Sequence, residues 1–160
     1  MKLRNIAGLM GLLVLLSPTA ALADHKAKAE LRGFEEVPAV SSTGIGRFNA
    51  RIDKAGTMID YELSYMNLEG TASAAHIHFG QRGVNGGVSA RLCGGGGKPL
   101  CPVSGTVTGV IFAADVIGPA GQGIAAGELA ELIAAMQSRI AYINVHTSKH
   151  PGGEIRGQIK

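Results

Sequence analysis

Segment 59–65 reads Ile-Asp-Tyr-Glu-Leu-Ser-Tyr, with apolar or aromatic residues at every second position and polar residues between them. Side chains two apart on a strand point to the same face, so this period of two predicts a strand with one face in a core and the other in water. The preceding residues 53–56, Asp-Lys-Ala-Gly, have the composition of a hairpin turn. The stretch therefore predicts an antiparallel β structure.

Seven further segments carry short alternating or apolar runs separated by glycine-rich turns: 28–33, 46–52, 74–79, 88–92, 105–113, 140–146 and 154–159. One segment, 127–138, has helical spacing instead, and its apolar positions share one face of a helix: Leu129, Leu132, Ile133 and Met136. About eight short strands and one short helix predict a single mainly β domain, an antiparallel, Greek-key-like β-sandwich.

The first 23 residues have the three parts of a secretory signal peptide. Lys2 and Arg4 precede an apolar run over residues 6–16, and Ala21-Leu22-Ala23 is a small-x-small cleavage pattern. We therefore expect a signal peptide at 1–23, one domain at 24–160, and a periplasmic or secreted product. No later apolar stretch reaches the roughly 20 residues of a spanning helix, so we expect no membrane anchor after processing.

Charge and cysteines narrow the classes of partner. The formal charge of +3 falls to +1 when Lys2 and Arg4 are removed, and no basic cluster remains, so we expect no nucleic-acid partner. Cys93 and Cys101 flank a short glycine-rich loop. In an exported chain with two cysteines a disulfide is the first interpretation, with free thiols as the alternative. Their spacing does not favour a zinc site.

Four of the five histidines lie in the stretches 75–80 and 142–151. His76 and His78 are two apart on an expected strand, so both imidazoles share a face and form a pair of possible metal ligands. His146 supplies a third nitrogen if its strand lies nearby, with His150 as an optional fourth. Imidazole suits copper and zinc, which makes copper the first candidate cofactor and zinc the second. The alternative is that these histidines are ordinary polar surface groups.

Motifs of enzymes are sparse. The chain has no Gly-x-Ser-x-Gly elbow, and its serines and aspartates do not indicate a catalytic triad. Glu35 and Glu36 are neighbours and would point to opposite faces of a strand, so they do not indicate a pair of catalytic carboxylates. Such residues are typically solvated. We therefore assign no catalytic residue and favour a non-enzymatic role.

Four stretches resemble the CHRD domain, the module named after its repeats in chordin: AELRGFEEVP at 29–38, AHIHFG at 75–80, AYINVHT at 141–147 and GEIRGQI at 153–159. The resemblance runs over nearly the whole of residues 29–159. It implies a β-sandwich module of exported proteins with no settled general activity. In chordin-like proteins the module belongs to an extracellular binder of growth factors.

A second likeness is limited to the histidine motifs, which resemble the copper ligands of copper-zinc superoxide dismutases. It implies copper ligation by His76, His78 and His146. The chain lacks the bridging histidine and the zinc loop of those enzymes, and Arg156 is only a possible counterpart of their arginine near copper. The leading hypothesis is therefore a non-enzymatic protein of extracytoplasmic metal handling. The alternatives are a module that binds an extracytoplasmic protein or polysaccharide, and a dismutase-like copper enzyme.

Overall fold

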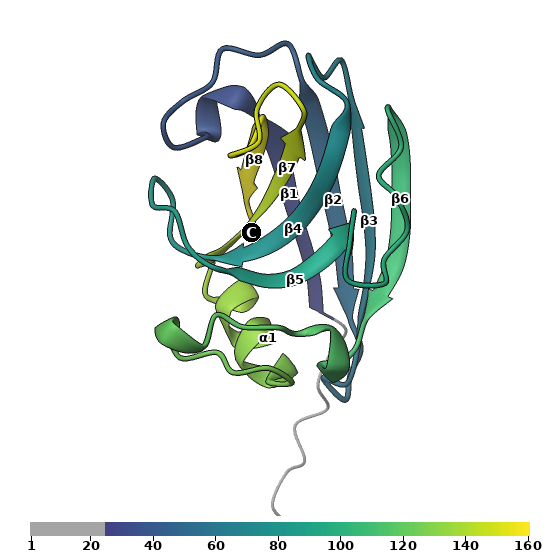
Figure 1. Ribbon diagram of the computed structural model, residues 1–160. Helices are drawn as coiled ribbons and strands as arrows, with labels where there is room; N and C mark the ends of the chain where they lie inside the picture. The colour runs from purple at the N-terminus through teal and green to yellow at the C-terminus, as the bar shows by residue number, and fades with distance from the viewer. Residues whose placement is uncertain (1–24) are drawn as a thin grey trace, which may run out of the picture.

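The computed structural model describes residues 25–160, so the predicted signal peptide lies outside the described residues. Within 25–160, no helix is long and apolar enough to cross a membrane. Eight antiparallel strands form one sheet in the order β5-β4-β7-β8-β1-β2-β3-β6 (Figure 1). Their bounds are β1 (His25–Arg32), β2 (Ile45–Ile52), β3 (Ile59–Met66), β4 (Ala72–Phe79), β5 (Val88–Cys93), β6 (Gly105–Ile111), β7 (Ala141–Thr147) and β8 (Ile155–Gln158). The predicted fold class is confirmed.

The sheet bends over on itself into two halves that meet at a short seam. Strands β5, β4, β7 and β8 make up one half, called here the histidine half, and β1, β2, β3 and β6 make up the charged half. At the seam, Arg32 of β1 pairs with Arg156 of β8. The two edge strands, β5 and β6, also come close to each other, which gives a nearly closed barrel.

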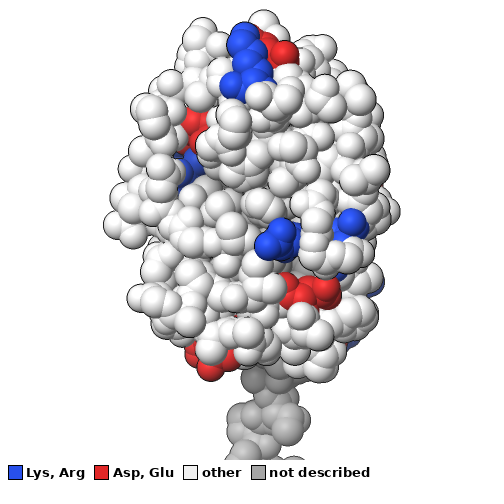
Figure 2. Space-filling view, in the orientation of Figure 1, with Lys and Arg blue, Asp and Glu red and all other residues white. Residues whose placement is uncertain are grey.

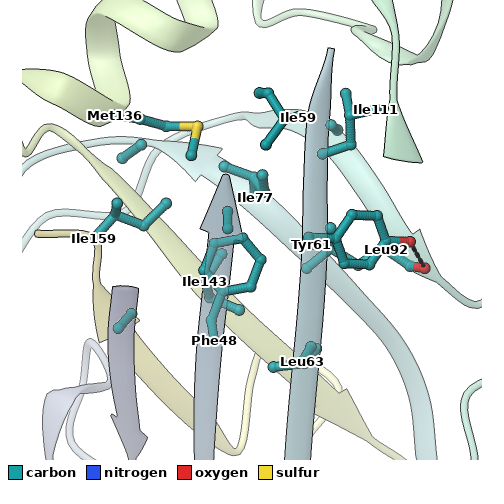
Figure 3. Packing of buried hydrophobic residues seen from close by; sticks show 14 of the residues in the cluster. Phe48, Ile59, Tyr61, Leu63, Ile77, Leu92, Ile111, Met136, Ile143 and Ile159 are labelled. Carbon is teal, nitrogen blue, oxygen red and sulfur yellow. Dashed lines mark hydrogen bonds between the residues drawn. The ribbon is translucent and has the colours of Figure 1, made fainter. Parts of the chain in front are cut away.

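The apolar core lies between the two halves and is built from alternate positions of each strand (Figure 3). Ile59 and Leu63 of β3 are fully buried, as the period of two in segment 59–65 predicts. Each such side chain stabilises the fold by about 1.5–3 kcal/mol. Between them, Tyr61 donates a hydrogen bond of 2.7 Å from its hydroxyl to the Leu92 carbonyl of β5, which ties the two halves together inside the core.

Helix α1 (Leu129–Gln137) lies across one end of the strands (Figure 1). Its buried residues include the four apolar positions identified from the sequence: Leu129, Leu132, Ile133 and Met136. The helix therefore closes one end of the core, and its prediction within 127–138 is confirmed. Three 3-10 turns complete the described elements: η1 (Gly33–Glu35), η2 (Ala113–Asp115) and η3 (Ala120–Gln122).

Cys93 and Cys101 form a disulfide, as expected, with a Cα–Cα distance of 5.1 Å. The bond joins the end of β5 to the segment that leads into β6 and closes the glycine-rich loop 94–97 over the edge of the histidine half. Figure 2 shows the face on which β4 and β5 lie in front. It carries few charged side chains, and most of these lie in small groups where basic and acidic residues are close together.

Candidate metal site

Strand alternation places His76 and His78 on the outer face of the histidine half, because Ala75 and Ile77 beside them are fully buried in the core. Strand β7 is the hydrogen-bonded neighbour of β4, and its pairing sets His146 opposite Ala74, next to His76. Two segments about 70 residues apart in sequence thus bring their histidines to one place.

The three imidazoles converge. One ligand nitrogen from each of His76, His78 and His146 lies within 4.8 Å of the others. The ring centroids of His76 and His146 are 5.0 Å apart, and His78 lies 5.6 Å from His76 and 5.9 Å from His146. Ligand nitrogens around one tetrahedral ion with bonds of 2.0–2.1 Å are about 3.4 Å apart, so small side-chain rotations would close the group on a metal.

Backbone carbonyls fix the tautomers of two of these histidines. The Nδ1 of His78 lies 3.0 Å from the Gly86 carbonyl, and the Nδ1 of His146 lies 2.9 Å from the Pro151 carbonyl. A carbonyl oxygen only accepts, so each Nδ1 carries the hydrogen and each Nε2 keeps a free lone pair. Metal-binding histidines commonly donate their second ring nitrogen in this way. A Cβ at Gly86 would lie 1.7 Å from the Phe79 carbonyl oxygen, so only glycine can bring its carbonyl to His78 here.

The free nitrogens of the cluster are buried and have no partner. These are Nε2 of His78, Nε2 of His146 and both ring nitrogens of His76. Burial lowers the pKa of His76 to about 3, with the neighbouring His146, His78 and Arg91 adding to the effect. Burial likewise lowers the pKa of His78 to about 4, and it lowers the pKa of His146. The three rings are therefore neutral near pH 7 and offer lone pairs.

His150, the optional fourth ligand, is not brought into this group. Its Nε2 lies 3.7 Å from a carboxylate oxygen of Glu69, on the turn between β7 and β8. Its backbone N–H donates to the Thr147 hydroxyl at 3.1 Å. The cluster therefore consists of three histidines.

A stacked column of side chains supports the cluster from β7 and β8. The rings of His78 and Tyr142 are 4.9 Å apart and nearly parallel, with 9° between their planes. The guanidinium carbon of Arg156 lies over the Tyr142 ring, 3.5 Å from the ring centre. Arg156 is only 1% exposed and donates to the Asn85 side chain and to the carbonyls of Gln81 and Val84. It thereby holds the loop that carries Gly86.

For Glu36, near the site, the prediction from the sequence is wrong. Glu36 lies outside any strand and is only 7% exposed, where a solvated carboxylate was expected. Its Oε2 accepts a 3.3 Å hydrogen bond from the Asn144 amide, while its Oε1 has no partner. Burial raises the pKa of Glu36 to about 7, against the opposing effects of Arg156 and Asn144. The local Glu-Glu pattern carries no signal of this burial, because the covering groups come from distant segments.

A model of the CHRD domain matches residues 27–159. The chain belongs to the CHRD domain family. No curated protein and no solved structure gave a match. The CHRD resemblance of the opening, middle and closing stretches is thereby confirmed, whereas none of these comparisons shows the likeness to dismutases.

Proposed function

We propose that this CHRD domain is an exported, non-enzymatic protein that binds copper, or zinc as the less favoured ion, through His76, His78 and His146 in extracytoplasmic metal handling. The observation that carries the proposal is the set of buried ring nitrogens that face one another without partners. Burial of a polar group without a hydrogen bond costs about 1–3 kcal/mol. A metal ion would bind one lone pair from each of the three rings at once.

The donor set favours copper and zinc over other ions. Three neutral imidazoles suit both metals, whereas magnesium and calcium need oxygen ligands. For a given nitrogen site, Cu²⁺ binds more tightly than Zn²⁺, which supports copper first. Bound there, the ion would hold three protein ligands and keep a position open for another. The extracytoplasmic role rests on the signal-peptide pattern of residues 1–23.

Metal titration of the purified protein tests the proposal. Cu(I), Cu(II) and Zn(II) are titrated separately into wild-type protein and into His76→Ala and His146→Ala. We expect one ion per chain with a Kd below about 1 μM. The metal affinity of each variant should fall by more than about 10–100-fold, the loss typical when a residue that only hydrogen-bonds to a ligand is removed, because here a ligand itself is removed.

His150→Ala is the matched control, since it removes a neighbouring imidazole that lies outside the cluster. It should bind metal within about threefold of wild type. Equal binding by all three variants, or wild-type binding weaker than micromolar, would show that the histidines serve no metal and would favour the interaction module. A superoxide assay on the copper-loaded protein tests the dismutase-like alternative, which needs activity above that of free copper.

A further inference from the structure

Two arginines flank the histidine cluster on the outer face of the histidine half. A continuous row of paired residues runs across three strand junctions: Arg91 with His76, His76 with Asn144, and Asn144 with Arg156. Arg91 acts electrostatically on His76, and Arg156 acts on His78. Among residues 25–160, these are the two arginines that are not classed as exposed.

The two guanidinium groups differ in their partners. Arg156 donates to three oxygen acceptors and stacks on Tyr142, so its charge is accommodated by the protein. The side chain of Arg91 has no hydrogen bond and no ion pair within the part that the structure describes, although the residue is half-buried. A guanidinium presents five donors in a rigid fork that matches the oxygen atoms of anions. No acceptor within the described residues therefore takes up the donors of the Arg91 guanidinium.

The disulfide loop restricts where the Arg91 side chain can go. A Cβ at Gly96 would lie 2.7 Å from Cδ of Arg91, and one at Gly95 would lie 3.1 Å from a guanidinium nitrogen. Gly96 has φ of +60°, so a glycine there also suits the backbone. The loop, closed by Cys93 and Cys101, thus packs its bare backbone along this arginine beside His76.

The charge at the proposed metal site favours an anion beside Arg91. Three neutral imidazoles do not offset the charge of a divalent ion, and no carboxylate belongs to the group of convergent ligand atoms. Arg91 adds a further positive charge beside them. A small anion on the open position of the metal would offset both charges and accept from the guanidinium.

We infer that Arg91 and the open coordination position together form a binding site for a small inorganic anion. The inference rests on the proposed metal-binding function. The protein would then take metal and anion as a pair, with the three histidines holding the metal and Arg91 holding the anion. The anion raises metal affinity by the same factor as the metal raises anion affinity, because binding free energies are reciprocal.

Azide titration measures this site directly. Azide is added by calorimetry to protein loaded with whichever ion the metal titration shows to bind, for wild type and Arg91→Gln. We expect azide to bind the variant about 10–100-fold more weakly, the range expected for loss of a hydrogen bond to a charged group. Metal affinity in azide-free buffer should stay within about threefold of wild type, because Arg91 is not a ligand.

Arg47→Gln is the control for charge. It removes one positive charge from an exposed position on β2, in the other half of the sheet, and should leave the azide affinity unchanged. Arg91→Lys keeps the charge and loses the fork, so a partial loss is expected. This variant also decides the question if Arg91→Gln does not fold.

The outcomes separate the two proposals. A chain that binds no metal overturns the proposed function and this inference with it. A chain that binds metal through the three histidines but takes up no azide, or takes it up equally well in wild type and both Arg91 variants, overturns the anion site alone. An equal loss of azide affinity in Arg47→Gln would also overturn the anion site, because the effect would then come from net charge alone.

Discussion

The outer faces of the two half-sheets carry polar side chains in the same alternating pattern, yet they lie in different surroundings. On the charged half, Arg51 and Glu62 lie in water. On the histidine half, Tyr142, Asn144 and Arg156 occupy equivalent outer positions and are only 1–3% exposed. Alternation thus distinguishes the side of a strand that faces the core from the outer side, but it does not show whether the outer side is exposed to solvent.

Loops account for the difference. The segment after β1 and the loop between β4 and β5 fold over the histidine half and contact each other. Arg82 of the second loop pairs with Glu35 of the first, and the Asn85 amide donates to the Val37 carbonyl at 2.9 Å. Polar groups beneath this cover interact more strongly than the same groups in water.

Replacing Arg156 by methionine should cause the largest loss of stability on the covered face of the histidine half. The change removes a buried cation that donates to three acceptors and stacks on Tyr142, and it frees the loop that presents Gly86 to His78. We expect the free energy of unfolding to fall by about 3 kcal/mol, because the three oxygen acceptors lose a charged donor. Metal affinity should fall by about 10–100-fold, as for loss of an outer-shell partner. Denaturant unfolding and metal titration measure the two effects.

Arg47→Met is its counterpart on the charged half. Arg47 is largely exposed and faces Glu30 at 3.8 Å, so its loss should change the free energy of unfolding by no more than about 0.5 kcal/mol. If the two variants proved equally stable, the covered face would have no greater energetic weight than the open one.

Replacing Glu36 by glutamine should have an intermediate, pH-dependent effect. The pKa of this carboxyl is raised from 4.5 to about 7 in the folded protein, so the folded state binds the proton more tightly than the unfolded state. Wild type therefore loses stability as the pH rises through this interval, whereas the amide variant has no such loss. From pH 4.5 to 8, the stability of Glu36→Gln relative to wild type should rise by about 1–3 kcal/mol.

Thermal or denaturant unfolding at several pH values gives this difference. Glu62→Gln, an exposed change on β3, is the control and should differ from wild type by a small amount at every pH. A flat difference between Glu36→Gln and wild type would mean that the carboxyl is solvated after all.

The contrast also explains how far the sequence could predict this molecule. Period-two alternation identified all eight strands, and helical spacing identified α1, because both depend on contacts between a residue and the core. Cys93 and Cys101 were paired correctly because they flank one short loop in sequence. The grouping of His76, His78 and His146 is confirmed as geometry. Two of them are two residues apart on one strand, and the third lies in the second histidine stretch, which also carries a CHRD motif.

The covered face itself could not be predicted in this way. The buried Glu36 accepts a hydrogen bond from Asn144, which is 108 residues away in the sequence. The place of Arg91 beside His76 depends on the pairing of β4 with β5, where two register irregularities interrupt the ladder. Alternation along one strand does not determine such pairings. It likewise does not determine where loop side chains lie, and His150 lies on the turn outside the group of three. Long-range cover is therefore the part that required the structure.

A second small effect is expected on the charged half, where Arg51 donates to the Asp60 carboxylate at 3.0 Å. Asp60→Asn removes the charge of this pair but keeps the shape of the side chain. The side chains are 57% and 38% exposed, so water screens the attraction. We expect a change of no more than about 0.5 kcal/mol in the free energy of unfolding, reduced further in high salt, and no change in metal or azide affinity. A loss approaching that of Arg156→Met would mean that this side of the sheet is also covered, for instance by a second chain, and the contrast between the two halves would then no longer mark the functional face.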